Sequence, residues 1–346
     1  MRRTIGAAAA TLLAASLLSA CAGTSADDST LVVAGYGAEY KEAFNKVIAE
    51  AFTKETGIEI EYQDAGSASQ YYAQTRASRG QPGFDIAVGT QVETYQGAEE
   101  GMLAPVTEEE VPNIANLPES LRKATHGAGI VQDVQYLALM YNEKTFSRPP
   151  TSWNVMWDPR YRSGTIIVNP SNLSGVYQIV LAAQLAGGGV DDIEPGFKRI
   201  AELAPHAAGT ITSSSEALPY MERGTATAFP YLDGRAGIYA ESTNFDYTLP
   251  QEGAIGLLGT LQIPSEASNK EAAYELMDFW LRPEIQKQWA EAYHVGPAIT
   301  GLDFDADFAA KHVTTEERLA DLQMLDPQVV IENRTDWSRR WAEAVD

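Results

Sequence analysis

The sequence predicts an α/β protein made of two α/β blocks. Short β-like runs alternate with amphipathic helical stretches along the chain, which is the order typical of this class. A length of 346 residues is enough for about two domains, and an apolar fraction of 45% is ordinary for a folded protein. The formal net charge of −22 disfavours binding to phosphate backbones, so nucleic acid is not an expected partner.

The N-terminus predicts export and lipid anchoring. Two arginines precede an apolar stretch that is shorter than the roughly 20 residues needed to span a bilayer, which favours a cleaved signal over a membrane anchor. The stretch closes on Leu18-Ser19-Ala20-Cys21, which resembles the lipobox of bacterial lipoproteins, whose cysteine is lipidated. We therefore expect a signal peptide over residues 1–20, lipidation of Cys21 and a tether over residues 21–29.

Cysteine and histidine usage argues against a metal centre. Cys21 is the only cysteine of the chain, and the four histidines are scattered without the spacing of metal ligands. An intramolecular disulfide and a multi-cysteine metal site are excluded. We expect neither a metal nor another cofactor.

The first block alternates three strands with two helices. Apolar side chains on one helical face predict a helix over 40–56, which Gly57 ends. The predicted strands are 31–34, 58–62 and 84–88, and the second helix is 70–78. Small or hydroxyl residues follow each strand, at 35–37, 66–69 and 89–91. Ligands of open α/β sheets lie beyond such strand ends, near helix N-termini, so these loops are expected to line a site.

The second block repeats the order of strand, polar loop and helix. Its predicted elements are a strand over 165–168, a helix over 173–186, a strand over 225–229 with its exit loop over 231–235, a Gly-rich run over 255–259 and a strand over 261–263. Helices are then predicted over 269–281 and 283–293, and the tail from 314 to 344 also has a helical pattern.

Several stretches of the second half resemble one family of transport proteins. These are Glu252-Gly253-Ala254-Ile255, Leu261-Gln-Ile-Pro264, Asn269-Lys-Glu-Ala-Ala-Tyr274, Phe279-Trp-Leu-Arg-Pro-Glu284 and Gly296-Pro297. Together with 52–57 and 157–161 they make residues 30–300 similar to the extracellular solute-binding proteins of ABC importers, in particular the spermidine/putrescine-binding group. The matching residues are packing and turn residues, so they support the fold and the transport role more than the identity of the solute.

The resemblance implies a type II periplasmic binding protein-like fold, in which two α/β lobes are joined by crossing strands and close on a ligand between them. Lobe 1 is expected over 30–140 and 261–310, lobe 2 over 141–260, and a C-terminal helical segment over 311–346. The chain is expected to cross near 136–142 and to return near 258–264. The implied partners are a small solute and ABC permease subunits, with the protein acting as a monomer outside the membrane.

The expected solute differs from that of the polyamine-binding relatives. Those relatives hold a dication with carboxylates and aromatic faces. Where they place acidic residues after the strand at 165–168, this chain has Ser171, Asn172 and Gly175. Where they place an aromatic residue and then an aspartate, it has Leu257 and Gly259. A polyamine therefore becomes an alternative rather than the first hypothesis.

Ten residues at the loop ends are the candidate ligand contacts. Hydroxyls and N–H groups at helix starts, together with one arginine, suit an anionic group, whereas tyrosine and aspartate side chains suit an ammonium. A zwitterion such as an amino acid or aminophosphonate, or else an organic acid, is therefore expected. The candidates are Tyr36, Ser67, Thr90, Gln91, Ser171, Asn172, Ser174, Tyr231, Asp233 and Arg235. For the serine, threonine and asparagine residues the competing interpretation is ordinary helix capping, and for Arg235 it is a surface or salt-bridging residue.

Two other functions have weaker support in the sequence. Ferric-binding relatives use adjacent tyrosines in the second lobe, whereas Tyr71 and Tyr72 lie on a predicted first-lobe helix and are expected to pack. An enzyme would need a nucleophile with its base, and the serines at 213–215 have no base nearby in sequence. We expect a binding component of an importer and no catalysis.

Overall fold

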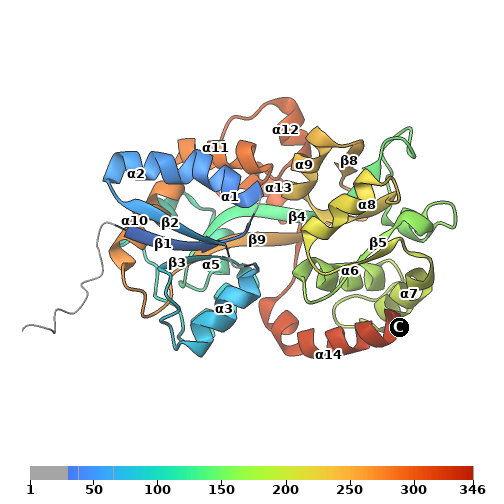
Figure 1. Ribbon diagram of the computed structural model, residues 1–346, viewed down its shortest axis with the longest axis horizontal. Coiled ribbons are helices and arrows are strands. Elements are labelled where there is room, and N and C mark those ends of the chain that lie inside the picture. Colours follow the sequence, from blue (N-terminus) through green and yellow to red (C-terminus); the bar gives the residue numbers. More distant parts are fainter. Residues whose placement is uncertain (1–29, 38, 65, 346) are drawn as a thin grey trace, which may run out of the picture.

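The computed structural model describes residues 30–37, 39–64 and 66–345. The predicted signal peptide, Cys21 and the tether lie outside the described residues. The chain forms two α/β lobes that lie side by side along the long axis of the molecule (Figure 1). The predicted fold class is therefore confirmed.

Lobe 1 is built on the larger sheet. Strand β1 pairs in parallel with β2 and β3, and β3 pairs antiparallel with β9. The order is β10-β4-β9-β3-β1-β2, in which β4 is Ile130–Asn142. The strands are β1 (Thr30–Gly35), β2 (Glu59–Asp64), β3 (Ile86–Thr90), β9 (Ile255–Gln262) and β10 (Gly296–Pro297). Parallel strands bring their carboxyl ends to one edge, and here that edge faces lobe 2 (Figure 1).

Helices cover both faces of this sheet. They are α1 (Glu39–Phe44), α2 (Glu50–Thr56), α3 (Ala68–Ala77), α4 (Gln91–Glu99), α5 (Glu119–Ala124), α10 (Lys270–Trp280) and α11 (Pro283–Tyr293). The helix predicted over 40–56 is interrupted by a π-helical turn over Asn45–Ala49, and Gly57 ends it with φ of 79°, as predicted. Buried Phe44, Ile48 and Phe52 pack it into the core.

One long strand connects the lobes. Strand β4 (Ile130–Asn142) is buried along all 13 residues. Its first half pairs with β9 of lobe 1, and its second half pairs with β7 (Ala228–Leu232) and β8 (Phe245–Thr248). The strand begins earlier than the predicted crossing, because the polar residues near its start interrupt the apolar run that signals a strand.

Lobe 2 carries a small parallel sheet of β5 (Ile166–Val168) and β6 (Gly209–Ile211). Its helices are α6 (Leu173–Gln184), α7 (Glu194–Leu203), α8 (Leu218–Glu222) and α9 (Asp233–Ser242). The strand predicted over 225–229 lies at 228–232, so 233–235 begin helix α9 and are not an exit loop. The Gly-rich run and the strand predicted after it are the single strand β9.

The C-terminal segment runs from lobe 1 along both lobes. It contains α12 (Ala306–Lys311), α13 (Glu316–Ala320), β11 (Gln323–Met324) and α14 (Pro327–Val345), so its helical prediction is confirmed apart from β11, which pairs with β9. Helix α14 packs against α4 and α7 and buries Trp337 and Trp341. Short 3-10 turns occupy Pro112–Asn116, Trp153–Trp157, Arg162–Gly164, Ala204–His206 and Ser214–Ala217.

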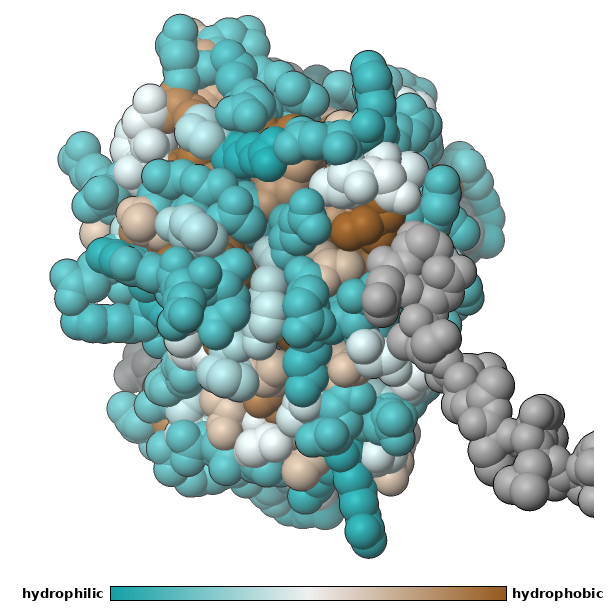
Figure 2. Space-filling view, turned by 90° about the vertical axis from the view of Figure 1, so that its left-hand side faces the viewer, coloured by the Kyte–Doolittle hydropathy of each residue, from teal (hydrophilic) through white to brown (hydrophobic). Residues whose placement is uncertain are grey.

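The surface is predominantly polar. Figure 2 shows the end of the molecule formed by lobe 1. Hydrophobic residues are exposed there only in small patches among hydrophilic ones. None of the helices in the described part of the chain combines the length and the apolar character needed to cross a membrane.

Candidate functional site

Gln91 connects the two lobes at the carboxyl end of β3. It is the first residue of α4, and its side chain is buried. Its Nε2 donates a hydrogen bond to the Tyr177 hydroxyl on α6 of lobe 2 at 3.1 Å, and its Oε1 accepts one from the Leu258 N–H of β9 at 2.9 Å. Gln91, a predicted site residue, therefore lies at the junction of the two lobes.

A second connection is an ion pair between α9 and α1. Arg235 Nη1 lies 3.0 Å from Glu39 Oε2, and the Tyr239 hydroxyl donates to Glu39 Oε1 at 2.9 Å. The Arg235 side chain is only 17% exposed. Helix α9 packs on β7 and β8 of lobe 2, whereas α1 follows β1 in lobe 1. The salt-bridge interpretation of Arg235 is thus the one that the structure shows, and the bridge spans the lobe boundary.

Aromatic rings surround this ion pair. Tyr36 meets Tyr40 edge-on at 5.3 Å, and Tyr40 meets both Trp289 and Tyr293. Burial raises the pKa of Tyr293 to about 12 and that of Tyr231, which lies 3% exposed, well above its ordinary value. These phenols therefore stay protonated and neutral at physiological pH.

A third contact across the boundary has a cavity beside it. Thr90 caps α4 by accepting a hydrogen bond from the Val92 N–H, and its hydroxyl donates to the Glu93 carboxylate. The other oxygen of Glu93 lies 3.8 Å from Nη1 of Arg334 on α14. A cavity of about 520 Å³ opens between α3, α4 and α14 at these side chains.

Asp133 is a functional candidate outside the ten residues selected from the sequence, although its carboxylate suits an ammonium. It lies in β4, is fully buried, and accepts hydrogen bonds from Trp289 Nε1 at 3.1 Å and Gln135 Nε2 at 2.9 Å. Burial raises its pKa to about 6. A side-chain carbon on Gly259 would collide with its carboxylate, so Asp133 fills the space above Gly259. The signal was a charged residue within an otherwise buried strand.

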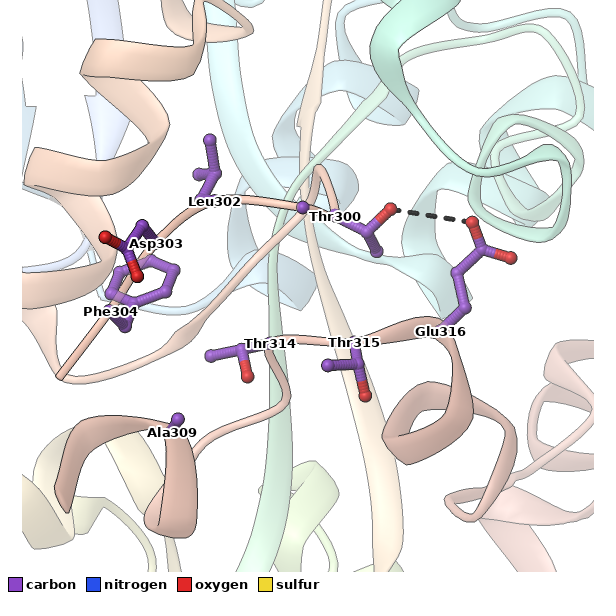
Figure 3. Close-up of a pocket in the computed structure, with 9 residues that line it drawn as sticks. Thr300, Leu302, Asp303, Phe304, Ala309, Thr314, Thr315 and Glu316 are labelled. Atoms are coloured by element: carbon purple, nitrogen blue, oxygen red, sulfur yellow. Dashed lines mark hydrogen bonds between the residues drawn. The ribbon is translucent and has the colours of Figure 1, made fainter. Parts of the chain in front are cut away.

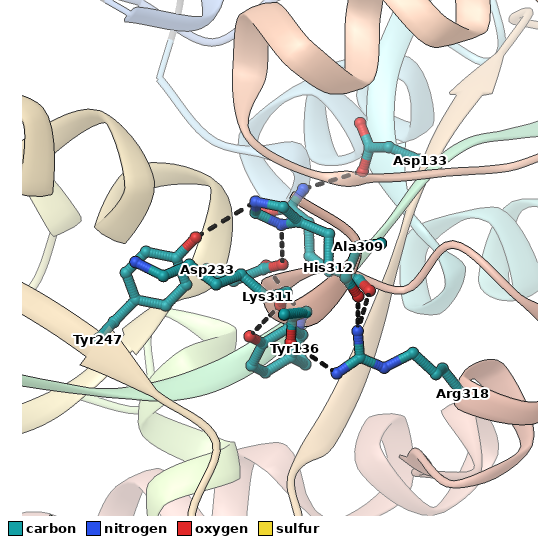
Figure 4. Close-up of polar contacts among 10 residues, drawn as sticks. Asp133, Tyr136, Asp233, Tyr247, Ala309, Lys311, His312 and Arg318 are labelled. Carbon is teal, nitrogen blue, oxygen red and sulfur yellow. Dashed lines mark hydrogen bonds and ion pairs between the residues drawn. The ribbon is translucent and has the colours of Figure 1, made fainter. Parts of the chain in front are cut away.

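Asp233 belongs to a buried structural network and not to the cleft surface. Its Oδ1 accepts a hydrogen bond from the Tyr136 N–H at 3.0 Å, and its Oδ2 lies 3.4 Å from His312 Nδ1. The network continues through Tyr247, 3.2 Å from His312, while Arg318 holds backbone carbonyls of the same segment (Figure 4). Asp233 thus fastens the C-terminal segment to β4, and its side chain is fully buried.

The remaining predicted residues lie mainly at helix starts. Ser67 caps α3 in a capping box with Gln70, and Asn172 caps α6 by accepting from the Ser174 N–H at 3.0 Å. Ser171 is exposed, and its carbonyl accepts a hydrogen bond from Arg334 at 2.7 Å. Capping therefore accounts for the side chains of Ser67 and Asn172.

The adjacent tyrosines of α3 are packing residues, as expected. The Tyr71 hydroxyl donates to the Gly35 carbonyl, and the Tyr72 hydroxyl donates to Glu100 at 2.9 Å. Over the described residues, no group of three or more histidine, cysteine, aspartate or glutamate side chains is placed to hold a metal ion.

A second hollow lies on the C-terminal segment. It has a volume of about 580 Å³ between the loop at 300–304 and the start of α13, where Thr300 reaches Glu316 (Figure 3). The charged side chains that line it are both acidic, Asp303 and Glu316. This hollow therefore offers a solute only negative charge, whereas the contacts between the lobes contain both acidic and basic side chains.

Comparison with known proteins agrees with this architecture. The family model described as "Bacterial extracellular solute-binding protein" matches residues 47–315. The spermidine/putrescine-binding periplasmic protein of Escherichia coli K12 is 28% identical over 253 residues, covering 70% of this chain and 71% of that protein.

Solved structures share the fold. An ABC transporter substrate-binding protein from Bradyrhizobium japonicum superposes with a TM-score of 0.77 at 19% identity, over 92% of this chain and 100% of that one. The PBP AgtB of A. tumefaciens R10, solved with agropinic acid, gives 0.75 at 18% identity, over 92% and 98%. The chain therefore belongs to the bacterial extracellular solute-binding proteins and has the fold of ABC transporter substrate-binding proteins.

Proposed function

We propose that this protein captures a small solute carrying both an ammonium and an acidic group, outside the membrane, and delivers it to an ABC permease. The observation that carries the proposal is that oppositely charged side chains meet across the lobe boundary, Arg235 with Glu39 and Arg334 with Glu93. A solute with both charges complements such a boundary without leaving a charge buried alone. The AgtB complex with agropinic acid supports an acidic solute in this fold.

The proposed mechanism is closure of two lobes around the solute. Closure favours uptake only if the solute binds the closed arrangement better than the open one. The Arg235 and Glu39 pair supplies part of the attraction between the lobes, and the hydrogen bond from Gln91 to Tyr177 supplies another part. The protein acts as a monomer without catalysis, held to the membrane by lipid on Cys21.

The test is a thermal-shift screen of residues 22–346 after unfolding and refolding to remove bound solute. Amino acids, aminophosphonates, organic acids, polyamines and ferric citrate are compared. A ligand at 100 times its Kd adds about 2.7 kcal/mol to stability, which raises the Tm visibly. We expect zwitterions to give the largest rise, whereas a rise with polyamines alone would contradict the proposal.

A polyamine is the second candidate, and Asp133 favours it. Its buried carboxylate accepts hydrogen bonds from Trp289 and Gln135, which are neutral donors and leave its negative charge uncompensated. The E. coli relative is named for spermidine and putrescine. If a polyamine is bound at Asp133, Asp133→Asn abolishes the shift with putrescine, whereas zwitterion binding at the lobe boundary persists in that variant.

A further inference from the structure

The cavity between α3, α4 and α14 lies on the lobe boundary. Helices α3 and α4 belong to lobe 1. Helix α14 contacts α4 of lobe 1 and α7 of lobe 2, where Arg340 pairs with Glu194 and covers the Phe197 ring. The C-terminal helix therefore closes one side of the space between the lobes, and a volume of about 520 Å³ suits a small molecule.

Two opposite charges face this cavity without completing their ion pair. The Glu93 side chain is 7% exposed, and one of its oxygens accepts a hydrogen bond from Thr90. The other oxygen lies 3.8 Å from Arg334 Nη1, which is too long for a hydrogen bond. Among the described residues, Arg334 donates one hydrogen bond, to the Ser171 carbonyl, so most of its five N–H donors remain for a ligand.

The other ion pairs nearby are already complete. Arg235 and Glu39 lie at 3.0 Å, with Tyr239 also bound to Glu39. At the outer end of the cavity, Arg76 lies 2.9 Å from Glu100, which Tyr72 also contacts. The pair of Glu93 and Arg334 thus differs from them in being both incomplete and next to a cavity.

We propose that Arg334 and Glu93 form the charged end of the solute site, where Arg334 binds the carboxylate or phosphonate of the solute and Glu93 binds its ammonium. This inference rests on the proposed function and deepens it. A guanidinium binds either acid in a bidentate manner, and a nearly buried carboxylate favours an ammonium that supplies the missing charge and hydrogen bonds. The C-terminal helix is then a wall of the solute site and not only a packing element.

Glu93 also connects this end to the rest of the cleft. Burial raises the pKa of Tyr36 well above its ordinary value, and the nearby Glu93 charge raises it further. Tyr36 follows β1 and stacks edge-on with Tyr40. The Glu93 carboxylate is therefore close enough to Tyr36 to influence its ionisation.

The test is calorimetric titration of 2-aminoethylphosphonate and 4-aminobutyrate into residues 22–346, which include every described residue. Arg334→Gln removes the anchor, and Arg339→Gln is the matched control, because Arg339 is an exposed arginine of the same helix that pairs with Asp336 and Glu343. We expect Arg334→Gln to raise Kd about tenfold or more, and Arg339→Gln to change it less than about twofold. Arg334→Lys keeps the positive charge but loses the paired N–H donors of the guanidinium. Its Kd should therefore lie between those of Arg334→Gln and Arg339→Gln.

The outcomes distinguish failure of the Arg334 role from failure of the proposed function. Circular dichroism and Tm establish that the variants fold, as expected while Trp337 and Trp341 still anchor α14. If the wild type binds either zwitterion and folded Arg334→Gln binds it equally well, the role of Arg334 is overturned while the proposed function stands. If the wild type binds neither zwitterion but binds putrescine, both proposals are overturned.

Discussion

At the residue scale, the most informative side chain is Asp133. It is an acid inside a strand that is buried along its whole length, and its hydrogen bonds come from neutral donors. Such a group is costly to ionise, which is why burial raises its pKa to about 6. Functional sites often contain groups of this kind, so its position at the lobe junction marks it for experiment.

We predict that Asp133 makes stability fall as pH rises from about 4 to about 6. The native state holds this proton more tightly than the unfolded chain, whose aspartate has a pKa of about 3.9, so stabilisation is complete below that value and is lost through pH 6. The loss is on the order of 2–3 kcal/mol, from 1.36 kcal/mol per pKa unit. Urea unfolding of the wild type and Asp133→Asn at about pH 4.5 and about pH 7.5 measures it. Parallel pH dependence in the two proteins would refute this role.

A substitution at Gly259, on the paired strand β9, tests the contact of Asp133 with this strand. A methyl group at this position would collide with the Asp133 carboxylate inside a packed strand pair. We predict that Gly259→Ala lowers the free energy of unfolding by about 1–3 kcal/mol. Gly189→Ala is the control, because nothing lies within 4 Å of the added carbon there. Equal stability of the two variants, measured by urea unfolding, would show that the strands accommodate the methyl group.

At the element scale, a residue at a helix start can have a structural role, a functional role or both. Asn172 caps α6 and follows Ser171, whose backbone carbonyl accepts a hydrogen bond from Arg334. A side chain that only caps a helix affects stability, whereas one that also binds solute affects affinity as well.

We predict that Asn172→Ala lowers stability by about 1 kcal/mol, while Asn172→Asp, which keeps a capping oxygen, retains most of it. Solute affinity should be unchanged in both variants, because the Asn172 oxygen is committed to the Ser174 N–H. Thermal unfolding and calorimetric titration measure the two quantities. Loss of affinity in Asn172→Ala without loss of Tm would place this residue in the site after all.

The sequence predicts most elements and only part of the site. Helix ends marked by Gly57 or by capping residues are found as expected, because these signals act within a few residues. The proximity of Asp133 to Gly259, and of Glu93 to Arg334, arises from strand pairing and helix packing between distant segments. Composition and local spacing do not reveal such pairs, so Asp133, Glu93 and Arg334 are not among the ten candidate ligand contacts.

At the scale of the whole molecule, function depends on how the two lobes separate. Polar side-chain contacts join the lobes near the strand ends, among them those at Gln91, at Glu39 and at Glu93. The strands β4 and β9 connect the lobes beneath these contacts. Polar contacts over a strand hinge suit an equilibrium that a solute can shift.

We predict that Arg235→Gln opens the lobes. The substitution removes the ion pair with Glu39 while leaving the hinge strands intact. Because Cys21 is the only cysteine, cysteines at exposed Lys46 and Lys198 can carry spin labels on opposite lobes in residues 22–346. The distance distribution should shift to longer values in Arg235→Gln. It should not shift in Arg160→Gln, whose partner Asp158 lies in the same lobe. Identical distributions in all three proteins would show that this ion pair does not hold the lobes together.

The solute itself can be identified by native mass spectrometry of the protein purified without unfolding, followed by analysis of any small molecule that denaturation releases. The lobe boundary, with its paired opposite charges, predicts a compound that carries both an ammonium and a carboxylate or phosphonate. Release of a polyamine instead would contradict the account and would assign the binding role to Asp133.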